Sequence, residues 1–172
     1  MNLIFDLETD GLLRDVSTMH CLAIHDLDNQ ETYTFNDQGS EEPVIRGIQL
    51  LSDADSIIGH NIIGYDIPVI HKLYSWFSNP GTVVDTLLLS RLYHSDMIKL
   101  DQKHNWKHMP LKLYGRHSLE SYGYRLSEFK GSFGSTTDWK EWSQEMQDYC
   151  IQDVNVTTKL WQHFQPYLTG SR

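Results

Sequence analysis

Short apolar runs separated by turn residues open the chain. Residues 2–7 form the first run, and residues 19–27 and 31–35 form two more that have the composition of β-strands. Residues 28–30, which begin with Asp-Asn, lie between the second and third runs and are typical of a tight turn. The pattern therefore predicts an antiparallel meander of three strands over residues 1–36.

From residue 41 onward, helical and strand-like segments alternate. The segments with helical periodicity or helix-start signals are 41–51 with Pro43 in its first turn, 66–77, 86–93, 117–122 and 139–165. The remaining segments are short strands over 56–60 and 81–85, an irregular polar stretch over 95–115 and a Gly/Ser/Thr loop over 131–137. This order predicts an α/β fold in which helices flank a mixed β-sheet, antiparallel at first and parallel later.

The bulk properties fit one globular domain. The chain has 172 residues, which we expect to form a single domain over 1–172 with a substantial core. No apolar run approaches the roughly 20 residues that span a bilayer, and no leader of basic and apolar residues opens the chain, so we expect no membrane partner. Cys21 and Cys150 are too few for a disulfide framework, which favours a reducing, cytoplasmic setting.

Charge is unevenly distributed along the sequence. The net charge of −9 argues against a protein that coats nucleic acid with a basic surface. Residues 91–130 differ, because they hold eight basic and four acidic residues interleaved with aromatic ones. Such a mixture suits backbone phosphates and stacked bases. A solvated surface with aromatic residues in the core would have the same composition, so both interpretations stand.

Two carboxylates share one face of the first predicted strand. Asp6 and Glu8 are two residues apart, so their side chains point the same way as that of Ile4. On a strand that flanks the core, the two charges repel each other and lose hydration unless a cation lies between them. A divalent metal with oxygen ligands is the usual cation at such a place. A strand-end pair that faces solvent is the alternative interpretation.

A third carboxylate lies on an apolar face of the predicted C-terminal helix. At about 100° per residue, Asp153 shares a stripe with Trp142, Met146, Tyr149 and Val156. A carboxylate on a buried face needs a charged or hydrogen-bonding partner, and Tyr149 lies one turn away on the same face. The stripe therefore indicates a functional position for Asp153. A simple Tyr149–Asp153 hydrogen bond or an exposed Asp153 would also explain it.

A fourth carboxylate follows a buried strand and a loop rich in Gly and Asn. Asp66 ends this loop, and active-site residues commonly occupy loops at strand ends. Because Pro68 follows two residues later, Asp66 would also suit a helix N-cap. We interpret Asp85 mainly as the N-cap of the next helix, with a supporting role at the site as the alternative. The histidines expected near loops, core or substrate rather than as metal ligands are His60, His94 and His117.

Three motifs, taken in order, resemble those of the DEDD superfamily of 3′–5′ exonucleases. The matching residues are Asp6 and Glu8 in the first motif, Asn61, Tyr65 and Asp66 in the second, and Tyr149 and Asp153 in the third. A tyrosine in the third motif, in place of a histidine one residue nearer the Asp, is typical of the tyrosine subtype (DEDDy). Each motif alone is a weak signal, whereas all three in order across one chain are a strong one.

A closer resemblance links most of the chain to the proofreading domain of family A DNA polymerases from short-tailed phages. It rests on the runs 89–95, 115–120 and 123–126 as well as on the three motifs. The resemblance implies a ribonuclease H-like fold. The chain departs from this family in that we recognise no polymerase domain in it, so we expect either a free-standing exonuclease or an excised domain. A DNA polymerase acting in trans is one implied partner.

The resemblance also implies a metal-dependent mechanism. Two Mg²⁺ or Mn²⁺ ions per site would stabilise the attacking and leaving oxygens during phosphodiester hydrolysis. By the resemblance, Asp6 bridges both ions, Glu8 and Asp153 complete one of them, and Asp66 holds the other. Tyr149 is expected to orient the attacking water, since an ordinary tyrosine pKa near 10 is too high for a good base at neutral pH.

The substrate implied is the 3′ end of single-stranded or frayed DNA, from which nucleoside monophosphates are released during proofreading. The residues expected near the terminal nucleotide are Leu7, Thr9, Asn61 and Tyr65. For Asn61, hydrogen bonding within its own loop is an equal alternative. An exoribonuclease of the same superfamily would use the same motifs. A catalytically silent module that only binds nucleic acid is the alternative from another functional class.

Overall fold

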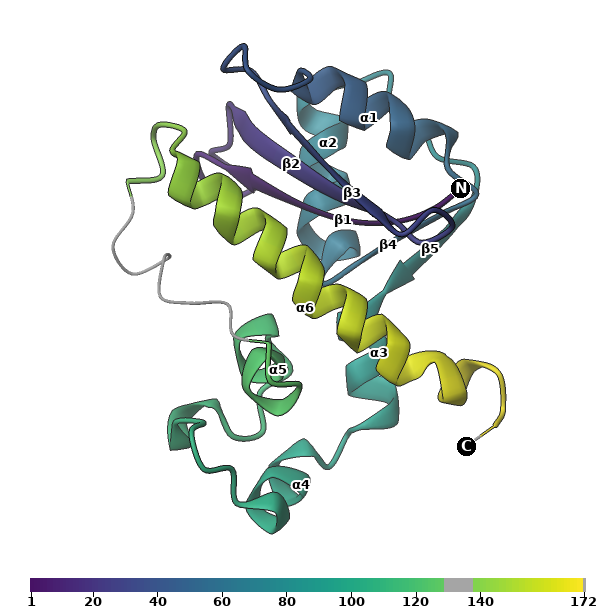
Figure 1. Ribbon diagram of the computed structural model, residues 1–172, viewed down its shortest axis with the longest axis vertical. Helices are drawn as coiled ribbons and strands as arrows, with labels where there is room; N and C mark the ends of the chain where they lie inside the picture. The colour runs from purple at the N-terminus through teal and green to yellow at the C-terminus, as the bar shows by residue number, and fades with distance from the viewer. Residues whose placement is uncertain (129–137, 172) are drawn as a thin grey trace.

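A five-stranded mixed β-sheet forms the centre of the structure, a computed structural model that describes residues 1–128 and 138–171 (Figure 1). The strands are β1 (Asn2–Thr9), β2 (Met19–Asp26), β3 (Glu31–Asn36), β4 (Ser56–Gly59) and β5 (Thr82–Asp85). Their order across the sheet is β3-β2-β1-β4-β5. The β1–β2 and β2–β3 pairs are antiparallel, and the β1–β4 and β4–β5 pairs are parallel. The predicted antiparallel meander and mixed sheet are therefore confirmed.

From residue 44 onward, helices alternate with the last two strands and then continue to Leu168. They are α1 (Val44–Asp53), a π-helix (Ile62–Asp66), α2 (Ile67–Leu73), α3 (Thr86–Tyr93), α4 (Met97–His104), a 3₁₀ turn (Leu111–Leu113), α5 (Leu119–Arg125) and α6 (Gln144–Leu168). The predicted loop over 131–137 lies outside the described residues. Among the described helices, none is long and apolar enough to cross a membrane.

The two faces of the sheet are covered by different helices. Leu3, Phe5 and Leu7 alternate along β1 and pack in one hydrophobic cluster with residues of α1 and α2. Ile4 lies on the opposite face and packs with Cys150 and other residues of α6. Figure 1 shows α6 crossing the sheet, with α5 and α3 beside it and α4 farther away. The alternation places the side chains of even-numbered β1 residues on the α6 side.

The segment between β5 and α6 is more helical than its sequence indicates. Residues 95–115 were expected to be irregular, yet they contain α4 and a 3₁₀ turn. Buried Met97 anchors α4 in a cluster with residues of α5 and α6. Buried Asp101, on the same helix, pairs with Arg125 of α5. These contacts join residues distant in sequence, so the local pattern of a polar segment does not reveal them.

The bounds of several helices also differ from expectation. The predicted helix 66–77 begins as a π-helix at Ile62 and ends as α2 at Leu73. The long C-terminal helix begins at Gln144 rather than at 139, because Ser143 caps it by accepting a hydrogen bond from the Met146 N–H. It continues unbroken through Pro166. The helix expected over 41–51 begins after Pro43, which is its N-cap residue and not part of its first turn.

Candidate active site

The carboxylates of β1 lie on the side of the sheet that faces α6. Asp6 and Glu8 are half-buried and alternate with Leu7, whose side chain packs in the core on the other face. The Cys150 thiol of α6 donates a hydrogen bond to the backbone oxygen of Asp6, with 3.3 Å from Sγ to O. One ligand atom each from Asp6, Glu8 and Cys150 lies within 4.8 Å of the others. The strand therefore delivers both acids to the surface of α6.

Asp66 reaches the same place from a π-helix at the end of β4. Asn61 adopts a left-handed conformation (φ 61°) immediately before this π-helix, which ends at Asp66. Asp66 occupies the predicted N-cap position of α2, but its buried side chain makes no capping hydrogen bond there. A π-helix is rare and often marks a functional site, and here it carries a buried acid.

The electrostatic environment of Asp66 is dominated by burial and other acids. Burial raises the pKa of its carboxyl well above the usual range, and the charge of Glu8 raises it further. The charges of Asp85 and Asp153 act in the same direction. Glu8 and Asp153 therefore both act on Asp66, although the three acids come from three different elements.

The long helix α6 supplies the last acid and the tyrosine. Asp153 is buried, whereas Tyr149, one turn earlier on the same face, is partly exposed. Met146 and Val156 of the predicted stripe are buried as expected. Trp142, in contrast, precedes the first residue of the helix. The stripe therefore presents Tyr149 and Asp153 to the same cleft as Asp6 and Glu8 of the central strand β1.

One open cleft of about 590 Å³ brings these side chains together. Of the residues singled out from the sequence, those that line it are Asp6, Leu7, Glu8, Asn61, Tyr65, Asp66, Tyr149 and Asp153. Thr9 lies in an adjoining cavity of about 400 Å³, which also borders on Leu7, Glu8 and Tyr65. The cleft thus gathers residues from β1, the π-helix and α6 that are up to 147 positions apart.

Thr9 and Tyr65 tie the end of β1 to the π-helix. The Tyr65 hydroxyl lies 2.5 Å from the backbone oxygen of Gly11, to which it donates, and 2.6 Å from Thr9 Oγ1. Thr9 Oγ1 also contacts the Gly11 oxygen at 2.9 Å. Burial raises the pKa of Tyr65, which remains a neutral donor at pH 7. The hydroxyls of these two residues therefore already serve the scaffold of the site.

Several residues of the cleft lie outside the three motifs and were not among the candidate site residues. They are Leu87 and Arg91 of α3, Arg116, His117 and Ser118 of the loop before α5, Leu119 of α5, and Trp139, together with His60 at the end of β4. The basic and aromatic composition of residues 91–130 was the available signal for the two arginines. It did not indicate which of the eight basic residues would face the acids.

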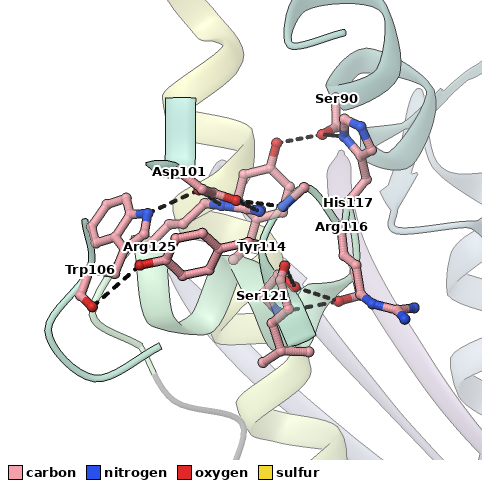
Figure 2. Close-up of polar contacts among 12 residues, drawn as sticks. Ser90, Asp101, Trp106, Tyr114, Arg116, His117, Ser121 and Arg125 are labelled. Atoms are coloured by element: carbon pink, nitrogen blue, oxygen red, sulfur yellow. Dashed lines mark hydrogen bonds and ion pairs between the residues drawn. The ribbon is translucent and has the colours of Figure 1, made fainter. Parts of the chain in front are cut away.

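A buried hydrogen-bond network fixes the loop that carries Arg116 and His117 (Figure 2). Asp101 accepts hydrogen bonds from Arg125, from the Trp106 indole and from the Gly115 backbone N–H. His117 Nδ1 lies 2.5 Å from Ser90 Oγ of α3. Burial, followed by the charges of Arg125 and Arg91, lowers the pKa of His117, so its ring is neutral at pH 7. The His60 ring bonds the His117 backbone oxygen at 2.8 Å and Thr86 Oγ1, in agreement with a structural histidine.

Residues 3–165 match the family model described as the RNase_H superfamily. The chain belongs to the RNase_H superfamily. It is 32% identical over 188 aligned residues to the DNA-directed DNA polymerases of Escherichia phage T7 and Enterobacteria phage T3, an alignment that covers 92% of this chain and 26% of each polymerase. The chain therefore spans about a quarter of the length of these curated relatives.

Solved structures of nucleases share the fold of this RNase_H-superfamily chain. NrnC of Brucella melitensis with bound Mg²⁺ has a TM-score of 0.61 at 18% identity, over 99% of this chain and 74% of that one. Escherichia coli RNase D, an exoribonuclease, has a TM-score of 0.54 at 15% identity, over 96% of this chain and 41% of that one. These likenesses confirm the predicted ribonuclease H-like fold. The 32% identity to the two phage polymerases agrees with the resemblance to phage polymerases.

The donor set of this superfamily member fits hard divalent cations. The four carboxylates in the cleft offer oxygen ligands, which Mg²⁺ and Mn²⁺ prefer. Burial and then the repulsion from Glu8 raise the pKa of Asp66, and a bound cation would relieve that repulsion. Cys150 lies close enough to join Asp6 and Glu8, but burial raises the pKa of its thiol well above the usual range. A protonated thiol is a poor ligand, so the oxygen donors decide the metal.

Proposed function

We propose that this chain is a two-metal-ion 3′–5′ exonuclease of the tyrosine subtype of the DEDD superfamily, acting on DNA. The observation that carries the proposal is the convergence of Asp6, Glu8, Asp66, Asp153 and Tyr149 on one open cleft, which sequence motifs from three distant segments anticipate. Structural ion-pair clusters can also gather acids. Here the acids line an open cleft and one of them is buried with a raised pKa, which is the pattern of functional sites.

Asp6, Glu8, Asp66 and Asp153 would hold two Mg²⁺ or Mn²⁺ ions. When bound, such ions stabilise charge on the attacking and leaving oxygens of a phosphodiester. The superfamily membership and the all-oxygen donor set both support this assignment. Without cations the acids repel a phosphate, so we expect binding of a 3′ end at the cleft to depend strongly on divalent metal.

The chain's own residues would bind and orient the substrate. Tyr149, partly exposed at the cleft, is in place to hold the attacking water by a hydrogen bond. Arg91 and Arg116 line the cleft and offer cations to the phosphates of the strand. Leu7 and Asn61 also line it and would contact the terminal nucleotide. Thr9 and Tyr65 would shape the adjoining cavity on the side of the terminal sugar.

DNA is the proposed substrate because the curated relatives are DNA polymerases. Proofreading is the proposed biological setting, either beside a polymerase in trans or as part of one, for the same reason. The fold likeness to RNase D keeps RNA as the competing substrate in the experiment. Matched 5′-labelled DNA and RNA single strands, with free and blocked 3′ ends, are incubated with the protein in Mg²⁺, in Mn²⁺ or in chelator.

The expected result is stepwise shortening of the DNA from its free 3′ end, dependent on metal. Asp6→Ala should abolish hydrolysis and leave the thermal unfolding transition intact, because Asp6 serves the metals and not the core. Asp53→Ala is the matched control, since Asp53 is an exposed acid at the end of α1, outside the cleft. Preferred cleavage of RNA would overturn the substrate assignment. Undiminished hydrolysis by Asp6→Ala would overturn the catalytic assignment.

A further inference from the structure

Asp85 does more than cap a helix. Its carboxylate is buried at the end of β5 and accepts the Leu87 N–H of α3 at 2.9 Å, which is the predicted cap. The same carboxylate accepts two further backbone N–H groups from another segment. These are Asn61 N at 2.8 Å on Oδ1 and Ile63 N at 3.0 Å on Oδ2. A cap needs one acceptor, so the other two bonds require a different explanation.

The segment that receives these bonds has an unusual backbone. Asn61 is left-handed with φ 61°, and the residues after it form the π-helix that ends at Asp66. Such a conformation persists only when surrounding contacts determine it fully. Asp85 supplies two of those contacts at the start of the π-helix.

Thr86, next to Asp85, holds the same segment from the other side. Its side chain is fully buried, and its hydroxyl donates to the Gly59 backbone oxygen at 3.2 Å. The hydroxyl also lies 2.8 Å from His60 Nδ1. Asp85, the last residue of β5, and Thr86, the first residue of α3, therefore form hydrogen bonds with residues 59, 60, 61 and 63. The distance in sequence, 22 to 27 positions, shows that this contact is tertiary and not local.

A carboxylate at position 85 has an electrostatic cost in this place. Its negative charge acts on Asp66 and adds to the repulsion among the acids. The benefit must therefore come from the two oxygens, which together accept three N–H groups, as an amide in the same position could not. The arrangement resembles the outer hydrogen bonds that orient the ligands of metal sites.

We propose that Asp85 is a positioning residue that holds the Asn61–Asp66 turn so that the Asp66 carboxylate meets the metals of the cleft. This inference rests on the proposed function, because it gives Asp66 a role as a metal ligand. Asp85 itself is not among the residues that line the cleft, so we assign it no ligand role. Its effect on the reaction is carried by Asp66.

The test compares Asp85→Asn with Asp26→Asn in the full chain. Asp26 is an equally buried carboxylate that accepts three N–H groups, two from the backbone and one from Asn29 Nδ2, at the β2–β3 turn. It pairs with Leu3, at the opposite end of β1 from Glu8. Calorimetry without substrate measures Mn²⁺ affinity, and thermal unfolding measures stability. Hydrogen exchange measures the exchange rates of the backbone amides of residues 61 and 63.

Asp85→Asn should weaken Mn²⁺ binding about tenfold or more and speed exchange of both amides. Asp26→Asn should leave Mn²⁺ affinity within about twofold, although it loses comparable stability. Equal Mn²⁺ affinity of Asp85→Asn and wild type, or equal weakening by Asp26→Asn, would overturn the positioning role. Wild-type protein that binds no Mn²⁺ would instead overturn the proposed function.

Thr86→Val provides a second variant if Asp85→Asn fails to fold. The substitution keeps the buried volume and removes the hydroxyl that hydrogen-bonds to the Gly59 backbone oxygen and to the His60 ring. We expect weaker Mn²⁺ binding, by several-fold, with a cooperative unfolding transition. Unchanged Mn²⁺ affinity in this variant would contradict the idea that the end of β5 positions Asp66.

Discussion

The carboxylate of Asp101 and the guanidinium of Arg125 form a buried ion pair, with 2.6 Å between Oδ2 and Nη2 (Figure 2). The side chains are 1% and 6% exposed. The pair joins α4 to the last residue of α5, and the same carboxylate accepts the Gly115 N–H directly before Arg116. An ion pair outside the cleft therefore sets the backbone from which a cleft arginine extends.

Arg125→Ala should destabilise the protein by about 3–5 kcal/mol, because it leaves the Asp101 charge buried with its main partner removed. Urea unfolding at pH 7 measures this. Arg46→Ala is the matched control, since Arg46 makes an exposed pair with Glu42 at 4.0 Å. The control should lose less than about 1 kcal/mol. Similar losses for both variants would show that the buried pair adds no more than a surface pair.

The same pair predicts how stability changes in acid. Burial alone would raise the pKa of Asp101, but hydrogen bonds from Arg125, Gly115 and Trp106 outweigh burial and lower it below 3.8. A lowered carboxyl pKa gives stability that is fully present above the unfolded value and is lost as pH falls through the folded value. Asp101→Asn should therefore be less stable at pH 6 and show a shallower loss of stability below about pH 4 than wild type. Urea midpoints measured from pH 6 down to about pH 2 would test this. If the urea midpoints of Asp101→Asn and wild type fell in parallel with pH, the ion pair would not be the source of this acid sensitivity.

Local rules were sufficient for the acids of β1 and α6. Asp6 and Glu8 lie two apart on a strand, and Tyr149 and Asp153 lie four apart on a helix, so periodicity alone predicts that each pair shares a face. The structure places both pairs in one cleft. The expected meander and the parallel strands also follow from short segments and their order.

Contacts between distant segments explain what the sequence did not reveal. The π-helix before Asp66 depends on N–H groups that Asp85 accepts across 22 and 24 positions. The helix α4 depends in part on Arg125, 24 positions after Asp101. Arg91 faces the cleft only because α3 follows β5 beside the site. No periodicity within a short window contains this information.

Asp66→Asn should stabilise the metal-free protein while it abolishes hydrolysis. Burial and then the charge of Glu8 raise the pKa of Asp66, so its ionised form is disfavoured in the folded state at neutral pH. The neutral amide removes this cost, and we expect a gain of about 0.5–2 kcal/mol in chelator, measured by thermal unfolding. Added Mn²⁺ should then stabilise wild type more than the variant, because metal binds the folded state. A less stable variant in chelator would contradict the electrostatic account of the cleft.

Tyr149→Phe should slow hydrolysis by about a hundredfold and leave Mn²⁺ affinity within about twofold, because the hydroxyl is proposed to orient the water and not to bind metal. Single-turnover rates on a labelled DNA strand, with calorimetric Mn²⁺ titration, measure the two effects separately. Tyr33→Phe is the control, since the Tyr33 hydroxyl bonds Glu31 on the far edge strand β3 and should affect neither value. A collapse of Mn²⁺ affinity in Tyr149→Phe would instead assign Tyr149 to the support of Asp153, one turn along the same face of α6.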